Sequence, residues 1–175
     1  MALSPFKLNL HELPRRAGDF KEYQLNFAAP EPIGNPMISI SKGDPIAIEL
    51  RAESVSDGIL LTGSITGHAT GECGRCLDEI SKEIHQKFQE LFFYENRATD
   101  EDFSMAGDIA DLEIPIRDAV ILALPINPLC KVECQGLCSN CGEKWESLDK
   151  GHSHEVIDPR WKGLSDWKPD PRFGR

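Results

Sequence analysis

Apolar and polar residues alternate along several short stretches of the first hundred residues, which is the pattern of strands with one buried face. Two such stretches lie near the N-terminus, at residues 6–10 and 23–27. Pro14 and Gly18 lie between them and favour a turn or loop. Residues 28–36 contain three prolines and are also expected to form a loop. The chain is therefore predicted to begin with short strands.

The clearest pair of strands surrounds Asp57-Gly58. Apolar residues occupy alternate positions along 46–52 before this pair and along 59–65 after it. An Asp-Gly pair favours a tight two-residue hairpin turn, because both positions of that turn require positive φ. Farther along, apolar residues recur every fourth position from 80 to 92, a spacing that fits a helix or a strand. The aromatic run 92–94 favours the strand, and a strand is the prediction.

A single helix is predicted after an acidic loop. Residues 95–111 are acidic and contain few apolar side chains, which indicates a loop. Asp111 can cap a helix over residues 112–124, which Pro125 ends. Because residues 119–124 are apolar nearly all round the helix, it should pack against the sheet. The predicted fold for residues 1–129 is α+β and mainly β: an antiparallel sheet or partly open barrel with one packed helix.

The charge is unevenly distributed along the chain. The formal net charge is −10, with 11 basic and 21 acidic residues in 1–129 and eight of each in 130–175. An acidic body excludes bulk electrostatic binding of a phosphate backbone, so any contact with nucleic acid is expected in residues 130–175. No stretch has the length of a signal-peptide core or of a membrane span. A cytoplasmic protein without a membrane partner is therefore predicted. In the reducing cytoplasm, clustered thiols bind metal more often than they form disulfides.

All six cysteines and two histidines form a pattern of metal ligands. Eight thiolate and imidazole ligands complete two tetrahedral zinc sites, so two zinc ions per chain are predicted. A Cys-x-x-Cys turn directs two sulfurs at one ion, and the chain has two such turns. The second is followed by Gly142, where a tight zinc knuckle needs positive φ. The candidate ligands are Cys73, Cys76, Cys130, Cys134, Cys138, Cys141, His152 and His154.

The preferred pairing joins the last four ligands in one site and the first four in the other. Swapped pairings, such as one four-cysteine site from residues 130–141, fit the spacing as well. Structural zinc takes four protein ligands and leaves no open position, so eight ligands for two ions argue against catalysis. No catalytic residue and no small-molecule substrate are therefore predicted. Residues 130–175 are expected to form a C-terminal zinc-knuckle lobe.

Other interpretations of these residues stay open. Cys73 and Cys76 could act as a thiol redox pair, although such a pair usually needs a strand-to-helix turn that lowers one thiol pKa. The flanks of this pair predict strands on both sides. A zinc-ribbon adaptor for transcription machinery is another possible function. His152 and His154 also fit ordinary solvated loop histidines.

Aromatic and basic residues alternate near the C-terminus. Such side chains stack on unpaired bases and contact phosphates, so this stretch is a candidate contact to RNA or to a protein partner. In the alternative, Trp161 and Leu164 pack onto the metal lobe, and Asp158 pairs with Arg160. The candidate contact residues are Arg160, Trp161, Lys162, Trp167 and Lys168.

Several motifs occur in order along residues 40–165. They are Glu72-Cys73-Gly74-Arg75-Cys76-Leu77 after a hairpin strand, a helix ending at 121–125, Pro128-Leu129-Cys130, the knuckle 136–142 and the segment 158–161. This order resembles the YceD family of bacterial large ribosomal RNA subunit accumulation proteins. Many members have Cys-x-Cys where this chain has His152-Ser153-His154, a change that keeps zinc ligands.

The resemblance implies a function that the residue pattern alone does not give. It implies a non-enzymatic role in the accumulation or processing of large-subunit ribosomal RNA, and hence in ribosome assembly. The implied partner is that RNA, or a ribosomal or assembly protein. From the charge distribution we expect this contact through the C-terminal lobe.

Overall fold

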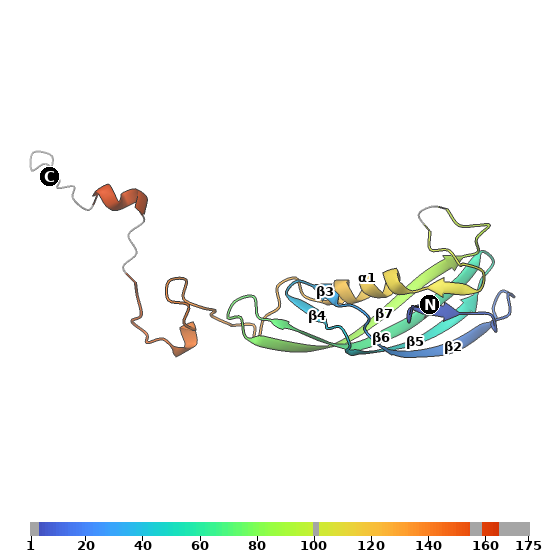
Figure 1. Ribbon diagram of the computed structural model, residues 1–175, viewed down its shortest axis with the longest axis horizontal. Coiled ribbons are helices and arrows are strands. Elements are labelled where there is room, and N and C mark those ends of the chain that lie inside the picture. Colours follow the sequence, from blue (N-terminus) through green and yellow to red (C-terminus); the bar gives the residue numbers. More distant parts are fainter. Residues whose placement is uncertain (1–3, 100–101, 155–158, 165–175) are drawn as a thin grey trace, which may run out of the picture. The chain divides into compact units, whose positions relative to one another are not determined.

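The computed structural model describes residues 4–99, 102–154 and 159–164 of the chain. It contains two compact units, Met1–Cys134 and Gln135–Arg175 (Figure 1). The division falls after Cys134, five residues beyond the boundary predicted after residue 129. Cys130 and Cys134 therefore belong to the first unit, together with the strands.

The main sheet of the first unit is antiparallel and has six strands. These are β2 (Phe20–Ala28), β3 (Ile33–Asn35), β4 (Ile38–Ile40), β5 (Pro45–Ser54), β6 (Gly58–Glu72) and β7 (Glu79–Phe93). The central strand β6 pairs with β5, β4 and β7, while β2 pairs with β5 and β3 pairs with β4. The sheet curls into a half-barrel (Figure 1). This confirms the predicted α+β, mainly β fold with a partly open barrel.

Alternate residues of the long strands face the core, as the sequence pattern predicts. On β5 the buried residues are Ile46, Ile48, Leu50, Ala52 and Ser54. On the same face of β6, glycine occurs at position 63. A Cβ added at Gly63 would lie 2.5 Å from the Glu49 carbonyl oxygen and 2.7 Å from Leu50 Cβ. The missing side chain therefore permits the close approach of β5 and β6 that the curl requires.

One helix and a small second sheet pack on the inner face. Helix α1 (Glu113–Ala123) contacts β7 and β3 and buries Pro115, Ile116 and Val120. Strand β1 (Lys7–Asn9) pairs antiparallel with β8 (Ile109–Asp111). Next to β1, the Phe6 ring meets the Phe27 ring edge-on, with centroids 4.9 Å apart. These elements complete a single apolar core in the first unit.

The periodic segments have the predicted structure. The stretch 6–10 contains β1, and the stretch 23–27 lies within the longer strand β2. The hairpin around residue 57 joins β5 to β6, and residues 80–92 lie within β7. The helix predicted over 112–124 is α1. The helix runs over Glu113–Ala123, and its N-cap is Leu112, which makes no side-chain capping hydrogen bond. The predicted cap at Asp111 is therefore wrong by one residue, although Asp111 Oδ1 accepts the Glu113 N–H at 3.1 Å.

The predicted tight turn at Asp57-Gly58 is wrong. Residues 55–57 connect the strands, and neither Asp57 nor Gly58 has positive φ. Gly58 is already part of β6, where an added Cβ would lie 2.1 Å from the Phe92 carbonyl oxygen. Glycine is needed here for contact with β7 and not for the turn.

Two predicted loops contain short strands. Residues 28–36 include β3, and residues 95–111 include β8. The acidic stretch is held by Met105 and Ala110, whose side chains are buried in the core. These strands have three residues each, which is too short to produce a recognisable alternation.

The second unit has little regular structure among its described residues. It contains an isolated bridge between Leu137 and Lys144 and two 3-10 turns, Trp145–Ser147 and Pro159–Leu164. Cys138 is the only buried side chain in the part of this unit that the structure describes. A unit without an apolar core needs another source of stability. Across both units, the described helices are all too short or too polar to cross a membrane.

Candidate metal centres

The first candidate site joins two segments that are far apart in sequence. Cys73 and Cys76 lie in the turn between β6 and β7, while Cys130 and Cys134 follow α1. The backbone N–H of Gly74 donates to the Pro128 carbonyl oxygen at 2.8 Å. The Arg75 guanidinium donates to the Cys134 carbonyl oxygen at 2.8 Å. These bonds hold the hairpin turn against the segment after the helix.

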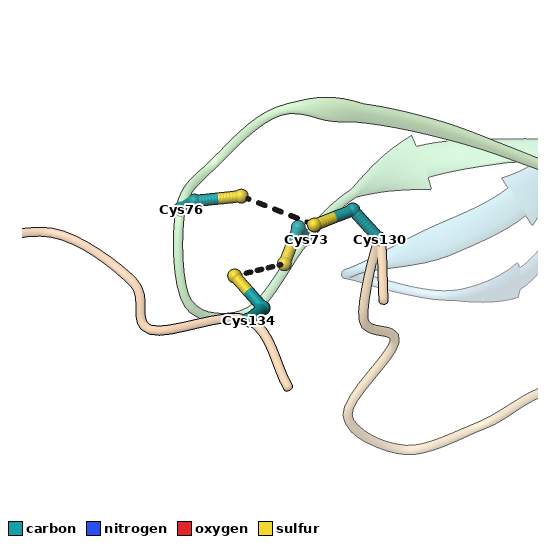
Figure 2. Close-up of side chains that lie close together, drawn as sticks. All are labelled: Cys73, Cys76, Cys130 and Cys134. Carbon is teal, nitrogen blue, oxygen red and sulfur yellow. Dashed lines mark hydrogen bonds between the residues drawn. The ribbon is translucent and has the colours of Figure 1, made fainter. Parts of the chain in front are cut away.

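The four sulfurs of this first group point toward one another (Figure 2). Cys73 Sγ lies 3.9 Å from Cys134 Sγ, and Cys76 Sγ lies 3.5 Å from Cys130 Sγ. All four sulfurs lie within 4.8 Å of one another. A tetrahedral zinc ion with bonds of about 2.3 Å places its sulfurs about 3.8 Å apart, whereas a disulfide bond is about 2.05 Å long. The geometry fits four thiolates around one ion.

The second candidate site lies wholly in the second unit. Cys138, Cys141, His152 and His154 also place their ligand atoms within 4.8 Å of one another. Cys141 Sγ lies 3.6 Å from His152 Nε2, close to the separation of about 3.6 Å that tetrahedral zinc gives a sulfur and a nitrogen ligand. The His152 ring is also edge-on to Trp145, with centroids 5.7 Å apart.

The two Cys-x-x-Cys turns have the same backbone structure. The N–H of Leu77 donates to the Cys73 carbonyl at 3.0 Å, and the N–H of Gly142 donates to the Cys138 carbonyl at 2.8 Å. The residue after the second cysteine has positive φ in both turns, 60° at Leu77 and 75° at Gly142. The positive φ predicted for Gly142 is therefore confirmed. The first turn belongs to the β6–β7 hairpin and the second to a loop, but both arrange their two cysteines in the same way.

Backbone donors favour one thiolate in each group. The N–H groups of Cys76 and Cys130 lower the pKa of Cys73 to about 6. The N–H groups of Cys141 and Asn140 likewise lower the pKa of Cys138 to about 6. Ordinary cysteine has a pKa near 8.5, so each group has one thiol that ionises readily.

Two other thiols of the first group, those of Cys76 and Cys130, resist ionisation. A backbone N–H of Asp78 favours the Cys76 thiolate, but burial and the surrounding thiols outweigh it and raise the pKa of Cys76 to about 12. The pKa of Cys130 is also raised: Cys76 lowers it, but burial and the thiols of Cys134 and Cys73 prevail. Several thiolates at this spacing repel one another unless a cation neutralises them. The group therefore has the chemistry of a cation site.

The predicted RNA-contact residues are described only in part. Arg160 and Trp161 lie in the turn Pro159–Leu164, and Trp161 is 60% exposed. This exposure disagrees with the alternative in which Trp161 packs onto the metal lobe. The side chains of Lys162 and Leu164, and all of Trp167 and Lys168, lie outside the described residues. The same holds for Asp158, so the proposed Asp158–Arg160 pair stays untested.

Two supporting residues were not found from the sequence. Arg75 bridges the two cysteine segments through the Cys134 carbonyl, and Trp145 packs against the ligand candidate His152. The sequence did contain a signal for Trp145. A tryptophan four residues after Cys141, in so polar a segment, has few apolar partners, so it could have been expected to pack beside a metal ligand. Arg75 gave no such signal, since exposed arginines are common.

Comparisons with known proteins agree on one family. The family model "Large ribosomal RNA subunit accumulation protein YceD" matches residues 61–168. An uncharacterized protein of Mycobacterium tuberculosis is 40% identical over 167 residues, which cover 92% of this chain and 80% of the relative. One of Mycobacterium leprae is 35% identical over 170 residues, covering 94% and 78%.

A more distant relative extends this similarity beyond mycobacteria. The uncharacterized protein YlbN of Bacillus subtilis is 22% identical over 160 residues, covering 89% of this chain and 90% of that protein. No solved structure matches the chain. From the family match and the identity to the mycobacterial proteins over most of both lengths, this chain belongs to the YceD family, as its motifs predicted.

Proposed function

We propose that this protein is a non-enzymatic factor for the accumulation or processing of large-subunit ribosomal RNA, and for ribosome assembly, in the cytoplasm. Two structural zinc ions would hold its shape. The description of the family names the RNA. The observation that carries the structural part is the four-cysteine group, which joins the β6–β7 hairpin to the segment after α1.

The two ions would have different roles in stability. Cys73, Cys76, Cys130 and Cys134 would hold one ion and cross-link a unit that already has an apolar core. Cys138, Cys141, His152 and His154 would hold the other ion in a unit whose described residues form no such core. In that unit the energy of metal binding would largely be the energy of folding.

A non-enzymatic role is supported by how the ligands are used. Each group offers four ligand side chains, which complete a tetrahedral site and leave no open position for water or substrate.

The charge distribution supports a contact with RNA through the second unit. Residues 135–175 have seven basic and seven acidic side chains, whereas residues 1–134 have 12 basic and 22 acidic ones. A phosphate backbone would be repelled by the first unit and tolerated by the second.

Metal analysis of purified protein tests the structural part. We expect two zinc ions per chain and no thiol that reacts before the metal is removed. His152→Ala should remove the second ion, and His152→Cys is the matched control that should retain it, because a thiolate is also a zinc ligand. Metal-free protein with a reversible Cys73–Cys76 disulfide would contradict the proposal and support the redox alternative.

Depletion in cells tests the role in RNA accumulation. We expect the large-subunit ribosomal RNA to fall relative to the small-subunit RNA, and the wild-type gene to restore the ratio. A variant that lacks both metal sites should fail to restore it, at an expression level matched to the wild type. An unchanged ratio after depletion would contradict the proposed function.

A further inference from the structure

The outer face of α1 exposes large aliphatic side chains. Ile114 is 59% exposed, Ile121 is 42% exposed and Leu122 is 84% exposed. Residues three and four apart lie on the same side of a helix, so these side chains and Asp118 share one face, named here the outer helix face. The opposite face buries Ile116 and Val120 in the core. The aliphatic residues of the outer face therefore contribute little to the core.

The loops around the four-cysteine group expose three more aliphatic side chains. Leu77 follows Cys76 and is 58% exposed, Ile126 follows α1 and is 91% exposed, and Val132 lies between Cys130 and Cys134 and is 88% exposed. Leu77 also has a φ of 60°. This conformation costs a residue with a side chain about 1–2 kcal/mol. The Cys-x-x-Cys turn requires this φ, so a leucine is costly here, and its exposed side chain adds little to the core and is free to contact a partner.

The charge of the outer helix face indicates the kind of partner. Asp118 lies among the aliphatic residues, is exposed, and forms no ion pair with any residue that the structure describes. The unit around it has 12 basic and 22 acidic residues. An isologous contact between two copies would bring two acidic units together, with Asp118 near its own equivalent. RNA would meet the same repulsion. A basic protein segment would not.

We propose that the outer helix face binds a lysine- and arginine-rich protein segment, which places aliphatic side chains on Ile121 and Leu122 and a cationic side chain on Asp118. The exposed loop residues Leu77, Ile126 and Val132 would offer further aliphatic contacts beside the cysteine group. This inference rests on the proposed function, because basic proteins of the large ribosomal subunit are the expected source of such a segment. Apolar contact supplies affinity, and the acidic surroundings select a basic partner and speed association.

Binding to purified ribosomal proteins tests the proposal. The probe is the protein mixture that high salt extracts from purified large ribosomal subunits, applied to immobilised, zinc-loaded full-length protein and quantified by mass spectrometry. We expect Asp118→Lys and Leu122→Lys each to weaken retention of one or more basic proteins at least about tenfold, because like charges across an interface are strongly unfavourable. Both positions are exposed, so neither change should prevent folding.

A matched control separates this surface from net charge. Glu49→Lys makes the same charge change as Asp118→Lys, at an exposed position of β5 on the sheet face opposite the core. It should leave retention within about twofold, since a distant exposed charge is screened by salt. Equal losses with Glu49→Lys and Asp118→Lys would overturn the proposal, and so would no loss with Asp118→Lys or Leu122→Lys.

The same variants distinguish the other occupants. If Asp118→Lys dimerises more strongly in sedimentation and retains the ribosomal proteins unchanged, the occupant is a second copy. If it binds large-subunit RNA more tightly and retains the proteins unchanged, the occupant is RNA. Either result overturns the proposal. If depletion lowers large-subunit RNA but Asp118→Lys restores it fully, the docking proposal alone fails. If depletion has no effect on the RNA, the proposed function fails.

Discussion

Leu77 and Gly142 occupy the same position in two turns of different origin. Each follows the second cysteine of its pair, and each has a positive φ, 60° for Leu77 and 75° for Gly142. Each donates its N–H to the carbonyl of the first cysteine. Glycine adopts this conformation without cost, whereas a leucine is strained in it. The two turns therefore differ in energy although they share a structure.

Gly142→Ala should weaken zinc binding at the second site by about 1–2 kcal/mol, or roughly tenfold, because alanine is strained at positive φ. Leu77→Gly should leave the affinity of the first site unchanged or raise it, since it removes the same strain. Competition with a chromophoric chelator measures both affinities. Gly151→Ala is the control, because an added Cβ there meets nothing within 4 Å and φ is not positive. Equal affinities for the Gly142 and Gly151 variants would contradict this account.

Cys76→Ser and Cys138→Ser should destabilise different units. The first removes a cross-link between segments more than fifty residues apart, and should lower the stability of the first unit by roughly 2–5 kcal/mol, the range for cross-links that close long loops. The second should unfold the metal lobe and leave the apolar core intact. Hydrogen exchange of the β6 and β7 amides separates the two outcomes. If both variants lose protection in these strands equally, the two sites are not independent.

The sequence predicted the long elements because their apolar periodicity is strong. Strand β5 alternates over its ten residues, whereas the apolar residues of β7 recur only every fourth position and its aromatic end decided the prediction. The structure brings the ligand candidates together in the same two sets that the preferred pairing names. That these sets bind zinc stays a prediction. The grouping of the ligand candidates could be predicted because each Cys-x-x-Cys turn has a fixed spacing that directs its two sulfurs to one point.

Other features depend on contacts that no local pattern encodes. Strand β8 exists because its partner is β1, about a hundred residues earlier. Gly58 resembled a turn residue, but the approach of the Phe92 carbonyl determines its role. The positive φ of Leu77 had no signal, since leucine is disfavoured in that conformation. Tertiary contact overrides local preference at each of these positions.

Asp108→Asn should destabilise the first unit at neutral pH. Asp108 accepts from His11 Nδ1 at 2.9 Å and from Arg15 Nη2 at 2.6 Å, and so joins the turn before β8 to the segment after β1. His11 and Arg15 lower the pKa of Asp108. A lowered carboxyl pKa gives stability that is fully present above the unfolded value of about 3.9 and is lost as the pH falls through the folded value.

Thermal unfolding from pH 7 down to pH 2 measures this effect. The difference between wild type and Asp108→Asn should shrink as the pH falls below about 4, where the Asp108 carboxylate takes up a proton. It should also shrink in high salt, because the pair is exposed. Glu49→Gln, at an exposed position on β5, serves as the control for the loss of one negative charge. A difference that grows toward acid would have the wrong sign for a stabilised carboxylate.

Gly63→Ala should destabilise the half-barrel, although alanine is normally better than glycine in a strand. An added Cβ would lie 2.5 Å from the Glu49 carbonyl oxygen and 2.7 Å from Leu50 Cβ, so β5 would have to move. Overpacking of this kind costs about 1–3 kcal/mol, which exceeds the roughly 0.5–1 kcal/mol that alanine gains over glycine in a strand. On balance, Gly63→Ala should therefore lower the stability of the first unit.

Urea unfolding of the first unit shows whether Gly63→Ala lowers or raises its free energy of unfolding. Thr62→Ala is a suitable comparison, because Thr62 is the preceding residue of β6 and is exposed on the outer face. Its stability should stay within about 0.5 kcal/mol of the wild type. A Gly63→Ala variant as stable as Thr62→Ala, or more stable than the wild type, would show that β5 can move away at no cost. The glycine would then not be what permits the curl.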